Sequence, residues 1–437
     1  MNRQITVQQA AALVRPRDTL AIPLATGQPM ALMNALSERT DWEKLEIFTG
    51  LLMFPYTLLT QPGVFVTSGY YGPIERFLNA QGANMEYLPA NFTGFETYAV
   101  RRPPRVIATT VSAPDKNGFV TFGTHCGAVY NPFLAACRDP ERIGIAEINP
   151  QMPVVYGDPA LGDNKISLKD IDYVFEADTT AIEMPPVEAT EVEKRIAKNV
   201  LDLIPNAATL QFGIGAVPDL IACHLAEGPL GDFGIHSELV ADGFLKLCRA
   251  GKISNKQKGI YAGQSIFTFA FGSRALYDFL DERNGCNNRQ AICLPVSTVN
   301  DPHVIAKNDG FVSINSGLMI DLAGQVCSEA IGAKQYSGVG GQLSFIEGAY
   351  YAKNGRSVIC LKSTASVNDK LVSNITASLP AGSLVSTPRH FTHYVVTEYG
   401  VADLWGVSDE KRPEKLIALA HPEFRESLRE DYNKLIH

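Results

Sequence analysis

Glu238 is the acidic side chain of this sequence whose surroundings best suit a chemical role. It follows Gly234-Ile235-His236-Ser237 and precedes apolar residues spaced three and four apart. This pattern predicts a helix that begins at Ser237 and ends before Gly251. Glu238 would then lie in the first turn, where backbone N–H groups and the helix dipole favour its ionised form. Helix stabilisation of up to about 1 kcal/mol would explain such an acid without any chemistry.

Two glycine-rich turns give this acid a possible partner. They are Gly213-Ile214-Gly215 and Gly338-Val339-Gly340-Gly341, in the same half of the chain as Glu238. Glycine lets the backbone approach a ligand and direct N–H groups toward it. A carboxylate can attack a carbonyl as a nucleophile when such donors stabilise the oxyanion that forms. The combination therefore suggests acyl chemistry on a carboxylate.

Other chemistries have weaker support. The Gly213 turn follows a strand and opens a helix, as in dinucleotide-binding folds, but Pro218 stands where the third glycine would be. His390 and His393 are three apart in a segment that reads as a strand, where such side chains point to opposite faces, so we expect no metal site. The sequence also lacks the Gly-x-Ser-x-Gly and Gly-Lys-Ser/Thr motifs of serine hydrolases and P-loop enzymes.

Composition indicates a globular protein of two or three domains. The chain has 437 residues, of which 46% are hydrophobic and 19% charged. Its net charge of −8 argues against a general affinity for nucleic acid, and eight scattered cysteines suggest buried free thiols. The polar N-terminus shows no signal peptide, and no apolar run is long enough to span a membrane. We expect a cytoplasmic protein.

A repeated pattern predicts the domain organisation. A helix, a strand starting Thr19-Leu20, a turn, Pro29 and a second helix recur about 190 residues later around Thr209-Leu210 and Pro218. A chance match of common elements is the alternative. We expect two similar α/β domains, 1–187 and 188–437. Strands are predicted at 45–48, 64–66, 106–111, 143–147, 209–212, 291–294, 312–315, 358–361, 384–387 and 394–396.

Several stretches together resemble one enzyme family. They are 111–115, 147–153, 210–218, 235–239, 313–316, 335–342 and 394–404. In combination they are similar to the class I CoA-transferases, and in particular to the 4-hydroxybutyrate CoA-transferase branch of the acetyl-CoA hydrolase/transferase family. The family's two open α/β domains of similar topology agree with the repeat, and the resemblance implies an active site in the cleft between them. Two departures, Ser344 and Trp405, put the identity of the acid substrate in doubt.

The resemblance implies a role for each matching residue. Glu238 matches the catalytic glutamate of the family. Apart from the resemblance, we expect His236, Ser237 and Gln28 to line an acyl pocket. The residues implied in CoA binding and the oxyanion hole are Gly213, Ile214, Gly215, Ala216, Val217, Pro218, Asp219, Ser313, Asn315, Gly338, Gly340, Gly341 and Lys362.

The resemblance also implies the activity. CoA would pass from an acyl-CoA, such as acetyl-CoA or butyryl-CoA, to a short-chain carboxylic acid such as 4-hydroxybutyrate through a glutamyl-CoA thioester. It implies no metal, no tightly bound cofactor, and a homodimer or higher homo-oligomer. An acyl-CoA hydrolase and a non-catalytic acyl-CoA binding protein remain the alternatives.

Overall fold

The computed structural model describes residues 3–158, 160, 164–184, 188–287 and 290–436. These residues form two compact units. Unit 1 contains Met1–Pro185, Glu238–Ala241 and Ser265–Asn300, and unit 2 contains Pro186–Ser237, Asp242–Gln264 and Asp301–His437. The boundary expected at residue 187 lies outside the described residues. Two short segments of the second half of the sequence thus belong to unit 1, and Glu238 begins the first of them.

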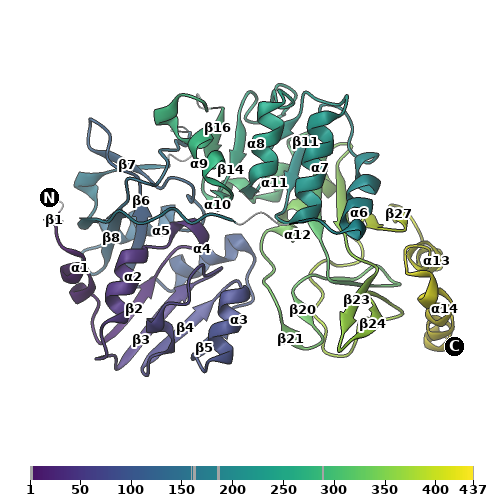
Figure 1. Ribbon diagram of the computed structural model, residues 1–437, viewed down its shortest axis with the longest axis horizontal. Helices are drawn as coiled ribbons and strands as arrows, with labels where there is room; N and C mark the ends of the chain where they lie inside the picture. The colour runs from purple at the N-terminus through teal and green to yellow at the C-terminus, as the bar shows by residue number, and fades with distance from the viewer. Residues whose placement is uncertain (1–2, 159, 161–163, 185–187, 288–289, 437) are drawn as a thin grey trace. The chain divides into compact units, whose positions relative to one another are not determined.

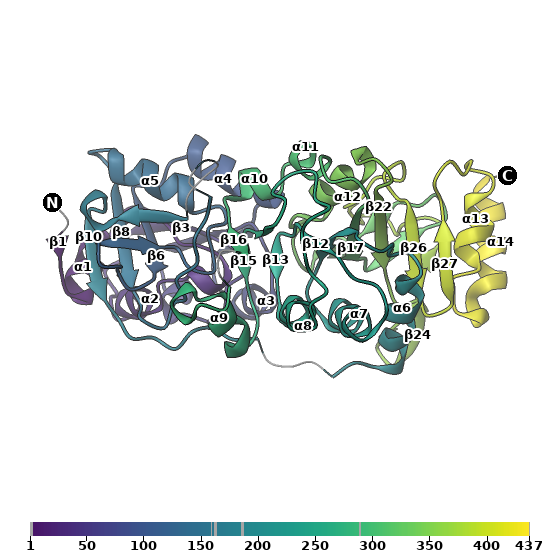
Figure 2. The same cartoon turned by 90° about the horizontal axis from the view of Figure 1, so that it is seen from above.

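Unit 1 is built on an eight-stranded sheet in which every neighbouring pair is parallel. Helices α4 and α5 cover one face, and α1, α2 and α3 cover the other (Figures 1 and 2). Because both faces are covered, its strands are apolar runs, and β6 is buried along its whole length. The strands in spatial order are β1 (Arg3–Gln4), β10 (Tyr173–Glu176), β8 (Ile143–Ile148), β6 (Val106–Val111), β2 (Arg17–Ala21), β3 (Lys44–Thr49), β4 (Val64–Ser68) and β5 (Met85–Tyr87).

The remaining elements of unit 1 surround this sheet. Its helices are α1 (Val7–Leu13), α2 (Met30–Ser37), α3 (Pro73–Ala80), α4 (Phe92–Arg101), α5 (Tyr130–Arg138), α9 (Arg274–Leu280) and α10 (Val296–Val299). Its short strand pairs are β7 (Phe119–Thr121) with β9 (Lys165–Ser167), β13 (Leu239–Val240) with β15 (Phe269–Ala270), and β14 (Ser265–Phe267) with β16 (Ala291–Cys293).

Unit 2 contains a six-stranded sheet that is parallel except at its last pair, β26 with β27. Helices α6, α7 and α8 lie on one face, and α11 and α12 on the other (Figure 2). The strands in spatial order are β12 (Gly234–Ile235), β11 (Thr209–Phe212), β17 (Phe311–Ser316), β22 (Arg356–Cys360), β26 (Tyr394–Thr397) and β27 (Gly400–Asp403). The helices are α6 (Glu191–Leu201), α7 (Ala216–Glu227), α8 (Asp242–Arg249), α11 (Pro302–Ile305), α12 (Gln342–Tyr351), α13 (Arg412–Ile417) and α14 (Arg425–Ile436).

Short strands extend unit 2 beside β17 and β22. They are β18 (Met319–Asp321), β19 (Val326–Cys327), β20 (Ala330–Ile331), β21 (Lys334–Gln335), β23 (Thr364–Val367), β24 (Lys370–Ser373) and β25 (Ile375–Thr376). The strand predicted at 384–387 is wrong, because this segment forms only one isolated bridge, between Thr387 and Val326, and leaves Leu384 and Val385 exposed. The other predicted strands are present. No helix within the described ranges is long and apolar enough to cross a bilayer.

Candidate active site

Glu238 does not begin a helix, so the helix predicted from Ser237 is wrong at its start. The residues after it form β13, which pairs in parallel with β15. The Glu238 carbonyl accepts the backbone N–H groups of Thr268 at 3.0 Å and Phe269 at 3.1 Å. Burial of Leu239 and Val240 in this pairing outweighs the local helix signal, and α8 starts only at Asp242. The carboxyl therefore receives no stabilisation from a helix dipole.

The carboxyl of Glu238 is instead controlled by burial and by one amide. Asn300, which directly follows α10, donates from Nδ2 to Glu238 Oε2 at 2.6 Å. Burial raises the pKa of the Glu238 carboxyl from 4.5 to about 7, and the Asn300 hydrogen bond acts in the opposite direction. At neutral pH a substantial fraction of this desolvated carboxyl is ionised. Sequence reasoning missed Asn300, since no motif distinguishes it.

His236 and Ser237 lie in unit 2, where contacts fix the chain just before Glu238. The fully buried His236 ring lies edge-on to the rings of Phe311 and Phe345, and its Nδ1 is 3.2 Å from Asn308 Nδ2. Ser237 Oγ donates to the Phe212 carbonyl at 3.2 Å. Both side chains thus anchor the backbone at this point.

The first glycine turn joins β11 to α7. Gly215 has φ of 117°, a conformation that side chains with a Cβ rarely adopt, and it precedes α7 with no side-chain cap on its N-terminus within the described structure. Ile214 is 43% exposed beside it. Asp219, in the first turn of α7, forms an ion pair with Lys246, whose Nζ lies 3.1 Å from Asp219 Oδ2. The N–H groups at the start of α7 are placed as donors.

A buried polar network lies at the same edge of the unit 2 sheet. Ser313 Oγ donates to Gln211 Oε1 at 2.8 Å, and Asn315 Nδ2 donates to Ser313 Oγ at 2.8 Å. Gly213 N–H donates to the carbonyl of Ile314 at 3.3 Å, between these two residues of β17. The network holds the Asn315 amide at the carboxyl end of β17, next to the first glycine turn. Gln211 is a member that sequence reasoning did not single out.

The second glycine turn lies directly before α12, and Lys362 lies in the loop after β22. Gly340 has φ of 57°, and Gly341 precedes α12, whose N-terminus has no side-chain cap among the described residues. Lys362 follows β22, and its Nζ is 3.0 Å from Glu193 Oε1 on α6. The loops after β11, β17 and β22 all leave from the carboxyl ends of parallel strands, where open α/β sheets bind ligands.

In unit 1, Gln28 belongs to a packed corner at the carboxyl ends of β2 and β3. It is 1% exposed, donates to the Leu51 carbonyl at 3.3 Å and accepts the Met53 N–H at 3.3 Å. Ala25 and Leu51 have φ of 47° and 44°, and Ala25 N–H donates to the Leu51 carbonyl. Non-glycine residues in this region carry strain of about 1–3 kcal/mol and cluster at functional sites.

Two fully buried carboxylates support this corner. Glu147 accepts the N–H groups of Ala31 at 3.0 Å and Leu32 at 3.2 Å, and Glu75 accepts that of Leu52 at 2.7 Å. Burial raises the pKa of each carboxyl to about 7. Their contacts fix the start of α2 and the loop after β3. No group of three His, Cys, Asp or Glu side chains suited to a metal occurs in the described part of the chain.

Comparisons with known proteins show which family this chain resembles. The acetyl-CoA hydrolase/transferase C-terminal domain model matches residues 272–432. The chain is 39% identical to a 4-hydroxybutyrate coenzyme A transferase of Clostridium kluyveri, over 98% of this chain and 97% of that protein. It is 35% identical to a butyryl-CoA:acetate CoA-transferase of Anaerostipes caccae, over 98% and 95%.

A solved structure shows the same fold over almost the full length. RipA from Yersinia pestis superimposes with a TM-score of 0.89 at 32% identity, covering 99% of this chain and 97% of that chain. Similarity of this extent, in both sequence and structure, is what relatives of one family share. The chain belongs to the acetyl-CoA hydrolase/transferase family and is related throughout its length to CoA-transferases.

Proposed function

We propose that this protein transfers CoA between an acyl-CoA and a short-chain carboxylic acid, with Glu238 as the nucleophile. The observation that carries the proposal is the partly buried carboxyl of Glu238, which is held at one oxygen by Asn300. Burial raises the pKa of this carboxyl to about 7. Desolvation makes a carboxylate more reactive than it is in water, and a pKa near the working pH keeps enough of it ionised.

The reaction proceeds in two half-reactions. The Glu238 carboxylate adds to the thioester carbonyl, and the C–S bond then breaks. CoA leaves as a thiolate and an acyl-glutamyl anhydride remains on the enzyme. The thiolate then attacks the glutamyl carbonyl, which gives a glutamyl-CoA thioester and releases the first acid as its carboxylate. A second carboxylate reverses both steps and leaves as the new acyl-CoA. No ATP is needed, because a thioester is present at the start and at the end.

Backbone donors have a defined part in this scheme. Each addition places negative charge on a carbonyl oxygen, and one well-aligned donor stabilises such an oxyanion by about 3 kcal/mol. We assign this role to N–H groups of Ile214, Gly215 and Gly340. Gly213 to Asp219, Ser313, Asn315, Gly338, Gly341 and Lys362 are assigned to CoA. The uncapped starts of α7 and α12 in the described structure support these assignments.

The two halves of the sequence, 1–187 and 188–437, are proposed to descend from one duplicated domain. In unit 1 the strands β3-β2-β6-β8-β10 are neighbours, and in unit 2 the strands β12-β11-β17-β22-β26 are neighbours. Numbered along each half, both sets have the order 2-1-3-4-5. Each set also begins with the repeated helix, strand and helix, α1-β2-α2 and α6-β11-α7. Agreement in order and in pairing supports duplication more strongly than the short repeat alone.

The experiment follows CoA from acetyl-CoA to butyrate or 4-hydroxybutyrate and measures free thiol without an acceptor. Transfer that exceeds thiol release is expected. Thiol release equal to the transfer rate would instead indicate a hydrolase, and no turnover of any acyl-CoA would indicate a binding protein. Borohydride reduces a glutamyl-CoA thioester to an alcohol, so peptide mass analysis after incubation with donor should find that product at Glu238.

Further expectations accompany this proposal. CoA is a substrate, with no tightly bound cofactor, and the enzyme works in the cytoplasm as a homodimer or a larger homo-oligomer. Light scattering on the purified chain measures the oligomer directly.

A further inference from the structure

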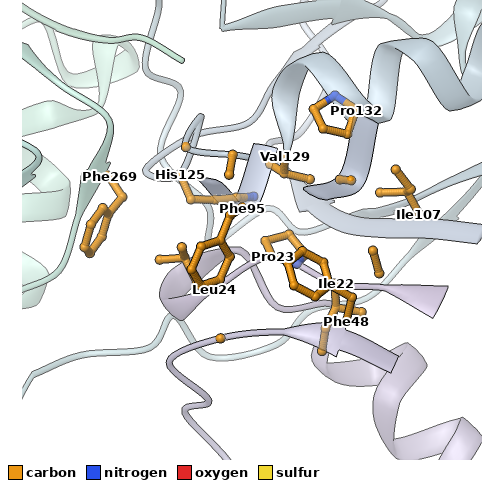
Figure 3. Close-up of a pocket in the computed structure, with 15 residues that line it drawn as sticks. Ile22, Pro23, Leu24, Phe48, Phe95, Ile107, His125, Val129, Pro132 and Phe269 are labelled. Carbon is orange, nitrogen blue, oxygen red and sulfur yellow. The ribbon is translucent and has the colours of Figure 1, made fainter. Parts of the chain in front are cut away.

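Unit 1 contains a small apolar cavity at the point where its strand order reverses. The cavity has a volume of about 40 Å³, and its wall includes Ile22, Leu24, Phe48, Phe95, Ile107 and Phe269 (Figure 3). Ile22 follows β2 and Ile107 belongs to β6, the two strands between which the order changes direction. Open α/β sheets bind ligands at this switch point, beyond the carboxyl ends of the strands.

Three glycines give the cavity its shape. They follow the neighbouring strands β2, β3 and β4, and each lies where a Cβ would collide with an aromatic ring of the wall. A Cβ on Gly50 or Gly69 would come within 2.6 Å or 2.1 Å of the Phe95 ring, and one on Gly27 within 2.1 Å of the His125 ring. Phe95 also contacts the Phe48 ring, with centroids 5.5 Å apart. The rings are therefore fixed in place, and the cavity between them is preformed.

The wall of the cavity is linked directly to the nucleophile's backbone. Phe269 N–H donates to the Glu238 carbonyl at 3.1 Å, and the Phe269 backbone also bridges to His125. Leu239, the residue after Glu238, packs in one cluster with Phe95 and Phe269. The cavity thus adjoins the segment that carries Glu238, within the same unit.

The wall offers little to a polar ligand. Its one side chain with polar atoms is His125, which is 2% exposed. The Nε2 atom of this ring is 3.0 Å from Thr109 Oγ1, and Nδ1 is buried without a hydrogen-bond partner in the described structure. Burial lowers the pKa of His125 to about 3, so the ring is neutral at physiological pH. The wall thus offers a hydroxyl group no side chain that could hydrogen-bond it other than this neutral ring.

We propose that this cavity binds the terminal carbons of an unbranched, unsubstituted short-chain acid, and that Phe95 limits the length of the chain. The proposal rests on the CoA-transferase function above. A water-sized group occupies about 10–15 Å³ of such a volume, so the cavity holds about three methylene or methyl groups. That number suits the tail of butyrate, whereas the methyl group of acetate is too short to fill it.

The preferred acid follows from this chemistry. A terminal hydroxyl in an apolar cavity loses its hydrogen bonds to water. For this reason apolar pockets favour a substrate without the hydroxyl over one that carries it by about 10- to 100-fold. We expect kcat/KM for butyrate to exceed that for 4-hydroxybutyrate by at least about tenfold. Hexanoate should be a poor acceptor because its two additional carbons exceed the room in the cavity, whose wall includes the fixed Phe95 ring.

The test compares acetate, butyrate, 4-hydroxybutyrate and hexanoate as acceptors from acetyl-CoA or propionyl-CoA. Ala99→Leu places a larger side chain in the cavity wall and should lower kcat/KM for butyrate at least about tenfold while changing that for acetate less than about threefold. Phe95→Ala should raise the hexanoate-to-butyrate ratio at least about tenfold. Ala135→Leu and Phe77→Ala, on exposed positions of α5 and α3, are the matched controls and should keep the wild-type ratios.

The outcomes separate this inference from the function on which it rests. If the wild type transfers CoA to none of the acids, the proposed function fails. If it transfers CoA to acetate but Ala99→Leu changes butyrate and acetate equally, the cavity assignment fails while the function stands. Preference of the wild type for 4-hydroxybutyrate over butyrate would also overturn the assignment. Thermal unfolding of each variant shows whether it is folded, and Ala99→Leu keeps the test decisive should Phe95→Ala not fold.

Discussion

The Asn300 amide lies 2.6 Å from one carboxyl oxygen of Glu238, and it is the group that opposes burial at this site. Burial disfavours the charged carboxylate, whereas an N–H donor stabilises it. The balance leaves the pKa at about 7. Burial therefore makes the Glu238 carboxylate reactive, whereas the Asn300 hydrogen bond keeps it ionised. Substitutions can separate the two effects.

Replacing Asn300 with Ala should raise the pKa of Glu238 further, because it removes the hydrogen bond that lowers this pKa and leaves the burial that raises it. At pH 7 less of the carboxyl is then ionised, and we expect kcat to fall about tenfold or more, with the midpoint of the pH–rate profile moved upward. The profile from pH 5.5 to 9 measures this. A uniform loss of rate at every pH, with an unchanged midpoint, would contradict the assigned contact.

Replacing Glu238 with Gln should abolish most of the activity and leave the fold intact. The amide keeps the shape of the side chain but cannot form the anhydride, and loss of a covalent nucleophile lowers kcat by about 10³-fold or more. CoA-transfer assays measure the rate of the variant, and its thermal unfolding shows whether it is folded. A variant that retains more than about a tenth of the wild-type rate would exclude Glu238 as the nucleophile.

Stability should depend on pH through the buried Glu147. Burial raises the folded-state pKa of this carboxyl from its ordinary 4.5 to about 7, so the folded protein binds the proton more tightly than the unfolded chain does. The resulting stabilisation is complete below pH 4.5 and is lost as the pH rises to 7. Relative to Glu147→Gln, the wild type should therefore lose on the order of 3 kcal/mol of unfolding free energy between pH 4 and pH 8.

Urea unfolding of both proteins at several pH values measures this difference. Glu86→Gln, at an exposed position of β5, is the control for removal of one negative charge. A constant difference between wild type and Glu147→Gln from pH 4 to pH 8 would show that Glu147 does not titrate as stated.

Much of the fold could be predicted from sequence because buried parallel strands are apolar runs bounded by turns. The segment 106–111 is one such run, and it forms β6 with the predicted bounds. The segment 384–387 has a similar composition, but its Leu384 and Val385 remain exposed. Composition therefore identifies a segment that could pair, whereas the presence of a partner depends on the whole fold.

The site was less accessible to sequence reasoning. The helix signal after Ser237 is local, whereas the pairing that overrides it joins Leu239 to Phe269, far along the chain. Asn300 and Gln211 have no motif, and their roles follow from contacts with Glu238 and Ser313 that only the folded chain creates. The assignment of Glu238 itself came from the combination of its motif with the family's other stretches.

Replacing Gly69 with Ala tests the rigidity of the apolar cavity. A Cβ there would lie within 2.1 Å of the Phe95 ring, so either the ring or the loop after β4 must move. We expect a loss of about 1–3 kcal/mol in unfolding free energy and lower activity with butyrate than with acetate. Gly231→Ala, where the nearest atom is 3.6 Å away, is the control. Wild-type stability of Gly69→Ala would contradict the fixed position of Phe95.

Lys258 joins two segments of unit 2 that lead into unit 1, one ending at Ser237 and the other at Gln264. Its buried Nζ donates to the carbonyls of Ile235 at 2.8 Å and Gln264 at 2.6 Å. Ile235 lies three residues before Glu238. Gln264 lies directly before β14, and β14 leads to Thr268 and Phe269, whose N–H groups donate to the Glu238 carbonyl. We therefore expect Lys258 to position the backbone at Glu238 without contacting the substrate.

Lys258→Met should leave both carbonyls without their donor and lower the unfolding free energy by about 1–3 kcal/mol. Because the backbone at Glu238 is less restrained, kcat should fall more than KM changes. Lys252→Met is the control, since the Lys252 side chain donates to one carbonyl, that of Gly228, and to neither Ile235 nor Gln264. If Lys258→Met loses stability while kcat below its unfolding temperature stays at the wild-type value, Lys258 holds the fold of unit 2 and does not position the nucleophile.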